Sequence, residues 1–219
     1  MRIRVATYNV RNTDGGKSLD GIAEELRGIN ADIIGLQELD RGVDRSGNAD
    51  LLAELSKKSG YANARFCRSI FFGGGEYGTG ILTRHKIVEF SVKRLPSAEE
   101  MRILTRFDID VDGTLIRFFN THLSLEKACR KVQLDLLAKD FCGGSSSVLV
   151  GDFNIDSFAE LEPFMGNNIA NFEGHSYTTF KTGGKIDNII TTPDIDISNV
   201  FLSESVYSDH NMLVADLDI

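Results

Sequence analysis

The sequence lacks the features that mark disulfide-linked and membrane-spanning proteins. Its 3 cysteines, Cys67, Cys129 and Cys142, are odd in number and show no CxxC spacing, so they predict neither a disulfide framework nor a zinc site. No apolar run approaches the length that spans a bilayer. Met1 leads directly into strand-like alternation, and no signal peptide is visible. We expect a cytoplasmic protein, or a secreted one if a leader precedes this sequence in the cell.

Proline and positive charge are also scarce. With 3 prolines in 219 residues, no Pro- or Gly-rich linker, repeat or low-complexity tract divides the chain, and we expect a single domain over residues 1–219 that acts as a monomer. The net charge of −8 opposes attraction to a nucleic-acid backbone. A local basic rim or a bound divalent cation can reverse the field at a site, so nucleic acid is a disfavoured partner and not an excluded one.

The stretch from Ser147 to Asn154 has the strongest local pattern. A short apolar run follows Ser-rich sequence and predicts a buried strand. Gly151 lets the chain turn at the strand end, where Asp152 and Asn154 then project a carboxylate and an amide. Open α/β sheets place their ligand crevice at such strand ends. The alternative interpretation is an ordinary turn, but several other apolar runs also have a polar residue at their tips.

Apolar periodicity predicts alternating helices and strands along the chain. The longest expected helix, over residues 125–141, should turn Ala128, Val132, Leu136 and Leu137 inward. Other helices are expected over residues 19–29, from residue 51 and over residues 158–164. Strands are expected over residues 2–10, 32–37, 61–67, 79–83, 102–111, 115–120, 147–152, 177–181, 186–192, 196–205 and 212–217.

Polar residues gather at the ends of these strands. Oxygen donors such as Glu38 and Asp209, without thiolates, suit Mg²⁺ or Mn²⁺ over zinc. An ion held by few carboxylates keeps open positions for water and a phosphate oxygen, as phosphoryl-transfer chemistry requires. The tip residues are Asn9, Glu38, Tyr77, His122, Asp152, Asn154, Asp187, Asp209 and His210.

Short motifs at these tips follow one another in a recognisable order. They are Thr7-Tyr8-Asn9, Gln37-Glu38, Asn120-Thr121-His122-Leu123, Gly151-Asp152-Phe153-Asn154, Ile186-Asp187 and Ser208-Asp209-His210. Across the whole chain this series resembles the endonuclease/exonuclease/phosphatase superfamily, with the deoxyribonuclease I-like fold. The resemblance implies a four-layer α/β sandwich, in which two mixed β-sheets pack face to face with helices outside. It also implies a divalent-metal-dependent phosphoesterase.

The resemblance assigns metal ligands and catalytic groups to particular residues. Glu38 matches the principal metal ligand, and Asn9 and Asp209 lie close to the metal or to a second ion. Asp152 matches the residue that orients or deprotonates the attacking water, and Asn154 matches its partner at the phosphate.

The resemblance also assigns His210 as the catalytic imidazole and Asp187 as its carboxylate partner. A carboxylate there fixes the imidazole tautomer and raises its pKa, so that a cation can face the phosphate. His122 matches a second histidine at the phosphate. Tyr77 and Arg102 match phosphate-contacting residues, for which packing or surface roles are the alternative.

The substrate is less well determined than the chemistry. The segment between Ser176 and Asp187 lacks the proline and tryptophan of many members, and the chain is compact, so we expect short specificity loops and a small or lipid-derived phosphoester. The alternative is a nuclease, which should show clustered cations near the motifs. A non-catalytic binding module should have lost Glu38, Asp152, Asp187 or His210, and none is missing. The only loose basic group is Arg65, Arg68, Arg84, Lys86, Lys93 and Arg94.

Overall fold

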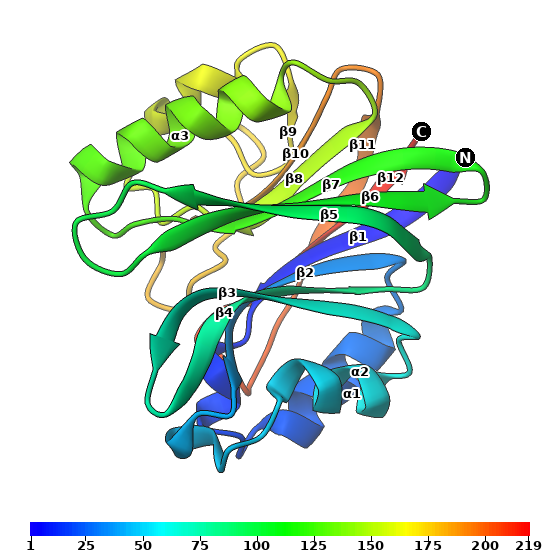
Figure 1. The fold of residues 1–219 in the computed structure, drawn as a ribbon. Coiled ribbons are helices and arrows are strands. Elements are labelled where there is room, and N and C mark those ends of the chain that lie inside the picture. Colours follow the sequence, from blue (N-terminus) through cyan, green and yellow to red (C-terminus); the bar gives the residue numbers. More distant parts are fainter.

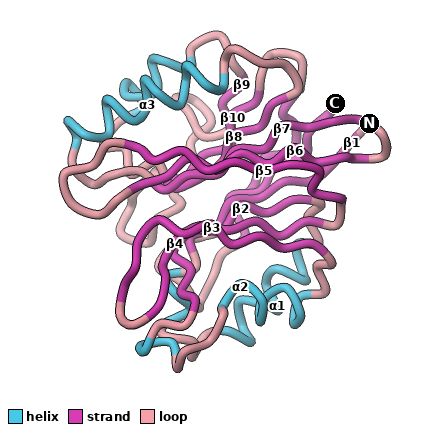
Figure 2. Tube along the Cα trace, in the orientation of Figure 1, coloured by secondary structure: helices cyan, strands magenta, loops and turns pink.

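The chain folds into two mixed β-sheets of six strands each, stacked face to face, with helices on both outer faces (Figure 1). The computed structural model describes residues 1–219. The first sheet has the strand order β11-β12-β1-β2-β4-β3 and the second the order β5-β6-β7-β8-β10-β9. This is the α/β sandwich expected from the sequence, with strands filling the middle and helices the outside in Figure 2.

The elements follow the order of the expected ones closely. The strands of the first sheet are β1 (Arg2–Asn9), β2 (Ile33–Arg41), β3 (Asn63–Phe72), β4 (Gly75–Thr83), β11 (Asp196–Ser203) and β12 (Met212–Asp218). The strands of the second are β5 (Lys86–Leu95), β6 (Arg102–Val111), β7 (Thr114–His122), β8 (Ser147–Asp152), β9 (Asn168–Ile169) and β10 (Asp187–Thr191). The helices are α1 (Leu19–Ile29), α2 (Leu51–Ser59) and α3 (Lys127–Phe141), with the 3₁₀ turns η1 (Arg11–Asp14), η2 (Asp44–Ser46) and η3 (Phe158–Phe164).

Three hydrophobic clusters correspond to the interfaces between the layers. The first fills the space between the sheets, where Val5 of β1, Phe107 of β6 and Val150 of β8 pack together. The second joins α1 and α2 to the first sheet, and the third joins α3 and η3 to the second sheet. Burial of apolar surface at each interface is the main force that holds the layers together. None of the helices is long and apolar enough to cross a membrane.

Each sheet contains one parallel strand pair connected through a helix. β1 lies parallel to β2 and is joined to it through α1, while β7 lies parallel to β8 and is joined to it through α3. The carboxyl ends of parallel neighbours meet at the same edge. Gly35 of β2 allows the sheets to approach closely there, because a Cβ at this position would lie 2.4 Å from the side chain of Val150.

The inward face of α3 differs from the expected one. Leu137 is buried as expected, but Val132 is 47% exposed. The buried face instead carries Arg130 and Gln133, both fully buried, with Leu134 of the same face. The spacing of apolar residues alone predicts the wrong buried face of α3. Arg130 and Gln133 can be buried because they form hydrogen bonds inside the protein.

Two strand assignments also differ from those expected. β5 has no counterpart among the elements expected from the sequence, because it is an edge strand whose apolar Val88, Phe90 and Val92 are substantially exposed. Residues 177–181 form no strand, although Phe180 makes an isolated bridge to His210. This bridge fixes the segment against the loop that leads into β12.

Candidate active site

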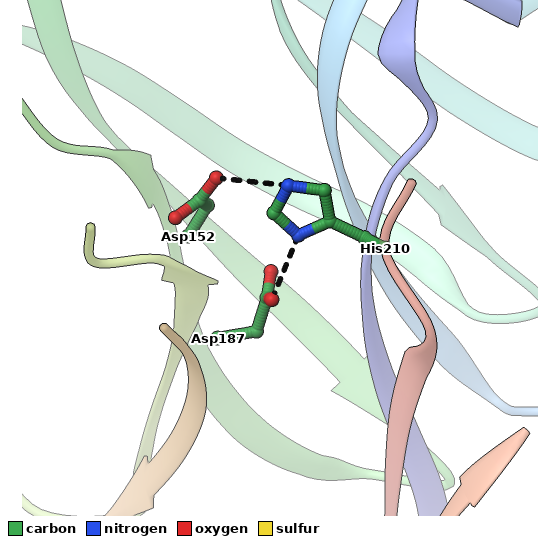
Figure 3. A group of neighbouring side chains, drawn as sticks. All are labelled: Asp152, Asp187 and His210. Carbon is green, nitrogen blue, oxygen red and sulfur yellow. Dashed lines mark hydrogen bonds and ion pairs between the residues drawn. The ribbon is translucent and has the colours of Figure 1, made fainter. Parts of the chain in front are cut away.

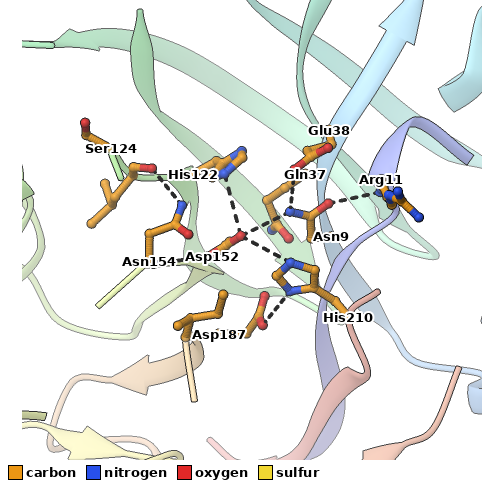
Figure 4. A network of polar contacts seen from close by, with 12 residues as sticks. Asn9, Arg11, Gln37, Glu38, His122, Ser124, Asp152, Asn154, Asp187 and His210 are labelled. Atoms are coloured by element: carbon orange, nitrogen blue, oxygen red, sulfur yellow. Dashed lines mark hydrogen bonds and ion pairs between the residues drawn. The ribbon is translucent and has the colours of Figure 1, made fainter. Parts of the chain in front are cut away.

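Polar side chains from both sheets meet at one end of the sandwich (Figure 4). Asn9 ends β1, His122 ends β7, Asp152 ends β8 and Asp187 begins β10. In the second sheet the strand register explains the meeting, because Asp152 pairs with His122 in parallel β7 and with Asp187 in antiparallel β10. The ends of β1 and β8 therefore bring one polar cluster together from two different sheets.

Glu38 reaches the cluster because β2 contains a β-bulge. The pairing of β2 with β4 shifts register between Leu36 and Leu39, and Glu38 inside this shift has a φ of 59°. A bulge redirects a side chain, and a left-handed conformation at a non-glycine residue costs about 1–3 kcal/mol. Glu38 Oε1 accepts a hydrogen bond from Asn9 Nδ2 at 2.9 Å. The strained bulge therefore places a carboxylate beside the end of β1.

Asp152 lies at the centre of the cluster. Its Oδ2 accepts a hydrogen bond from Asn9 Nδ2 at 3.1 Å and lies 3.6 Å from His122 Nε2 and 3.7 Å from His210 Nε2. Its Oδ1 accepts a hydrogen bond from the backbone N–H of Asn154 at 3.0 Å. Asn154 has a φ of 50°, a conformation that asparagine tolerates better than most residues. Asp152 is thus fixed on both oxygens, and one of them faces two imidazoles.

His210 and Asp187 form the pair expected from the sequence (Figure 3). His210 Nδ1 lies 2.9 Å from Asp187 Oδ2, and both side chains are buried. Thr179 holds the aspartate in place, because its Oγ1 accepts hydrogen bonds from the backbone N–H groups of Ile186 and Asp187 at 3.2 and 3.1 Å. The pairing directs His210 Nε2 toward Asp152.

Burial and neighbouring charge change the protonation of these groups. Burial opposes a charge on His210, but the charge and hydrogen bond of Asp187 outweigh it and raise the pKa of His210 to about 9. Burial and the Asp187 carboxylate raise the pKa of Asp152 to about 7. Burial, with Arg102 and His210 nearby, holds the pKa of His122 well below its usual range. The two histidines therefore differ in charge near neutral pH, because His210 favours the protonated form and His122 the neutral form.

Asp152, Asp187 and His210 form a buried group that can hold a metal ion. Their ligand atoms lie within 4.8 Å of one another, and Asp187 Oδ1 is buried without a hydrogen-bond partner. A buried carboxylate oxygen without a donor is unfavourable unless a cation or water meets it. Two carboxylates and an imidazole without thiolates suit a divalent cation. This group can therefore hold a divalent metal, but it shares no residue with the ligands Glu38, Asn9 and Asp209 that were expected from the sequence.

Asp209 and Ser208 come from the loop between β11 and β12. Ser208 Oγ donates a hydrogen bond to the backbone carbonyl of Asn9 at 2.7 Å, which fixes this loop against β1. Asp209 Oδ2 lies 3.4 Å from Arg11 Nε, and the Asp209 side chain is 36% exposed. The structure thus places Asp209 at the open edge of the cluster.

Tyr77 of β4 and Arg102 of β6 lie beside His122, the member of the cluster that ends β7. Both are largely buried and border a small cavity together with His122. Burial, and then the charge of Glu38, raises the pKa of the Tyr77 phenol. Glu76, in contrast, is paired with Arg41 and with Arg68. The structure therefore brings Tyr77 and Arg102 to the site, while Glu76 stabilises the β3–β4 hairpin.

Two buried residues of α3 support the site and were not identified from the sequence. The Arg130 guanidinium donates hydrogen bonds to the carbonyl of Ser124 at 3.2 Å, in the loop after β7, and to Glu160 at 2.7 Å in η3. Gln133 accepts a hydrogen bond from the Ser124 N–H at 2.9 Å and donates one to the carbonyl of Pro96 at 2.7 Å. In the sequence, the only indication of their role is that these polar residues have the helical spacing of the residues on the buried face.

A cavity of about 580 Å³ lies between α3 and η3. Lys127, Lys131, Glu160 and Pro163 are among its lining residues, and it contains no member of the polar cluster. Its location on the outer face of the second sheet separates it from the converging carboxylates and imidazoles. We therefore place the candidate active site at the polar cluster and not at this larger cavity.

Comparison with known proteins assigns the chain to a family. A model of the Endonuclease/Exonuclease/phosphatase family matches residues 6–210, which include every residue of the cluster. No curated protein matches the chain.

Solved structures share the fold over the whole chain at low sequence identity. An endonuclease/exonuclease/phosphatase from Beutenbergia cavernae has a TM-score of 0.85 at 21% identity, covering 99% of this chain and 71% of that one. A humanized TDP2 from D. rerio has a TM-score of 0.79 at 19% identity and covers 100% and 99%. A mannosyl-6-phosphatase from Bacteroides thetaiotaomicron has a TM-score of 0.76 at 18% identity and covers 99% and 100%. Since the family model spans most of the chain, the protein belongs to the endonuclease/exonuclease/phosphatase family and is a phosphoesterase of that family.

Proposed function

We propose that the protein is a Mg²⁺- or Mn²⁺-dependent hydrolase of phosphodiesters or phosphomonoesters in small or lipid-derived substrates. The observation that carries the proposal is the buried Asp152–His210–Asp187 cluster. It combines a carboxylate whose pKa is raised to about 7 with an imidazole whose pKa is raised to about 9. A base with a pKa near the working pH is suited to proton transfer. A neighbouring imidazolium can face the negative phosphate.

In this proposal Asp152 orients the attacking water and accepts its proton. His210 donates from Nε2 to a phosphate oxygen, because its Nδ1 is held by Asp187 at 2.9 Å. Asp187 is a positioning residue that fixes the tautomer and favours the charged imidazole. These steps require only that the phosphate binds on the open side of the cluster, within hydrogen-bond distance of His122 Nε2 and His210 Nε2.

The phosphate contacts come from Asn154, His122, Tyr77 and Arg102. Asn154 Nδ2 donates to the carbonyl of Leu123 at 2.9 Å, which sets the orientation of its amide. His122 is neutral near pH 7 and therefore offers a hydrogen bond without a second full charge. Arg102 supplies the positive charge on this side of the phosphate.

We propose that Glu38, Asn9 and Asp209 hold the divalent cation, and that the group of Asp152, Asp187 and His210 does not, because a protonated His210 cannot act as a ligand. Glu38 and Asn9 are hydrogen-bonded to each other at 2.9 Å, and Asp209 borders the same end of β1. When bound, such an ion neutralises charge that develops on the phosphoryl oxygens and lowers the pKa of a bound water.

A small substrate is favoured because the cations near the site are already paired. Arg41 and Arg68 are both paired with Glu76, and Arg45 binds both oxygens of Asp40 at 2.8 Å. The net charge is −8. Binding of a nucleic-acid duplex requires basic side chains that replace the counterions along its phosphate backbone. Few unpaired basic side chains remain near this site.

A nuclease is the second candidate, and one feature supports it. Phe71 at the β3–β4 hairpin is 74% exposed, and the Arg68 guanidinium lies 3.9 Å from its ring centroid. Exposed aromatic rings and arginines are used to stack the bases of single-stranded nucleic acid. The fish TDP2 that shares this fold has been solved with a single-strand DNA product.

A phosphoester panel with Mg²⁺, Mn²⁺ and EDTA tests the proposed function. We expect hydrolysis with either cation and none in excess EDTA. Glu38→Gln should lower the activity by orders of magnitude, because it removes an anionic ligand of the ion. Glu24→Gln, on the exposed face of α1, is the matched control and should retain full activity. Full hydrolysis in excess EDTA would contradict the proposal.

A further inference from the structure

A small cavity beside the candidate active site contains polar atoms that no protein group satisfies. It lies between β4 and β6, borders His122, and has a volume of about 10 Å³, which is room for roughly one water-sized group. Thr79, Glu100 and Arg102 line it. It adjoins the reacting centre, since His122 Nε2 lies 3.6 Å from Asp152 Oδ2.

Three buried atoms of this cavity have no hydrogen-bond partner. They are Thr79 Oγ1, Glu100 Oε1 and Arg102 Nε. Glu100 Oε1 lies 2.8 Å from Arg102 Nη1 as an ion pair, without a hydrogen bond between them. Thr79 is 2% exposed and the Arg102 side chain 9% exposed. Buried polar groups in proteins are nearly always paired, so the arrangement points to a ligand group that enters the cavity.

Of the three residues that carry these atoms, Glu100 is the most exposed. The Glu100 side chain is 33% exposed, while its Oε1 is buried against Arg102. A group carried by the substrate therefore reaches the unpaired atoms when the Glu100 side chain moves aside, without a change in the backbone of β4 or β6.

The chemistry of these atoms identifies the group. Arg102 Nε is only a donor, an ionised Glu100 Oε1 is only an acceptor, and a threonine hydroxyl can be either. A hydroxyl is the water-sized group that accepts one hydrogen bond and donates another. A phosphate oxygen would be repelled by Glu100, and an apolar group would leave Thr79 Oγ1 and Arg102 Nε without hydrogen-bond partners.

We propose that this cavity is a subsite for a substrate hydroxyl next to the phosphate, and that Glu100 selects phosphoesters of polyols or sugars. The inference rests on the proposed function, because the phosphate must lie at His122. Glu100 acts in two ways, since it accepts a hydrogen bond from the hydroxyl and disfavours a second anionic group beside the phosphate that is cleaved. Sites that hydrogen-bond a substrate hydroxyl discriminate strongly against analogues that lack it.

The test compares two alkyl phosphates that differ only in hydroxyl groups, glycerol 3-phosphate and propyl phosphate. We expect kcat/KM with Mg²⁺ to favour glycerol 3-phosphate by at least about tenfold. Glu100→Ala and Thr79→Val should each reduce this ratio at least about threefold, and Glu100→Gln, which keeps an acceptor oxygen, should retain more of it than Glu100→Ala. Glu99→Ala, at the exposed neighbouring position, is the matched control and should leave the ratio unchanged.

The outcomes separate this inference from the proposed function. Equal kcat/KM for the two alkyl phosphates in the wild type, with hydrolysis of both, would show that the cavity holds only a water and would overturn the inference alone. If neither these compounds nor bis-p-nitrophenyl phosphate is hydrolysed, the proposed function fails. Titration calorimetry with the same pair then decides the subsite, because tighter binding of glycerol 3-phosphate supports it and equal binding contradicts it.

Discussion

Replacement of Asp187 by asparagine should change the protonation of His210 without removing the imidazole. The pKa of His210 is raised from 6.5 to about 9, with Asp187 as its main favourable neighbour at 2.9 Å. One pKa unit corresponds to about 1.4 kcal/mol, so the charged imidazole contributes about 3 kcal/mol to stability. In Asp187→Asn we expect the pKa of His210 to fall to 6.5 or below, because burial is then opposed by less negative charge.

The sign of the pH dependence follows from linkage. Because the folded-state pKa of His210 lies above its value in the unfolded chain, its stabilisation is complete below pH 6.5 and is lost as the pH rises through about 9. The wild-type protein in EDTA should therefore lose about 3 kcal/mol of unfolding free energy over this window. Asp187→Asn should lack this loss, because its His210 is already neutral there.

Two assays check this prediction. NMR titration in EDTA follows the imidazoles directly, which is practical because the chain has 4 histidines. Urea unfolding at a series of pH values gives the stability difference. Asp187→Asn should also lower kcat, but less than His210→Ala does. An unchanged pKa of His210 in the variant would refute the reasoning, and so would full activity of Asp187→Asn beside an inactive His210→Ala.

The remaining predictions concern activity and stability. Glu38→Gln should lose orders of magnitude of activity while its unfolding midpoint stays near the wild-type value, as activity assays with Mg²⁺ and thermal unfolding would show. Asp152→Asn and His210→Ala should each lower kcat strongly. The loss in the double variant should be far from the sum of the two single losses in activation free energy, because both groups act on one transition state. Strictly additive losses would show that the two groups act independently. Arg130→Leu should destabilise the fold by about 3–5 kcal/mol in urea unfolding, because it leaves the largely buried carboxylate of Glu160 and the carbonyl of Ser124 without their partner. Lys131→Leu at the exposed neighbouring position should change stability by less than about 1 kcal/mol.

The position of the polar cluster could be predicted from the sequence because it depends on local patterns. Asn9, Asp152 and Asp187 each stand at the end of an apolar run, and strand ends at a sheet edge are where a crevice forms. The register of β8 with β10 then brings Asp152 opposite Asp187. The pairing of Asp187 with His210, which the family resemblance implied, is present at 2.9 Å.

Other features depend on contacts that no local pattern shows. Arg130 and Gln133 change the buried face of α3, because their polar groups are satisfied by Glu160 and Pro96, which are distant in sequence. Glu100 lies in a loop with no periodicity, and its position near Thr79 appears only when β4 and β6 are brought together. The exposure of Phe90 in β5 is likewise set by the position of that strand at the sheet edge.

The most direct test of the proposed substrate class compares kcat/KM for bis-p-nitrophenyl phosphate, a phosphoinositide headgroup and plasmid DNA at several salt concentrations. Each phosphate contact that releases a counterion steepens the loss of DNA binding with salt by roughly 0.9 in log–log slope. With a net charge of −8 and its nearby arginines paired, the protein should prefer a small phosphoester and show a shallow salt dependence. Efficient DNA cleavage with a steep inverse salt dependence would contradict this account and make the protein a nuclease.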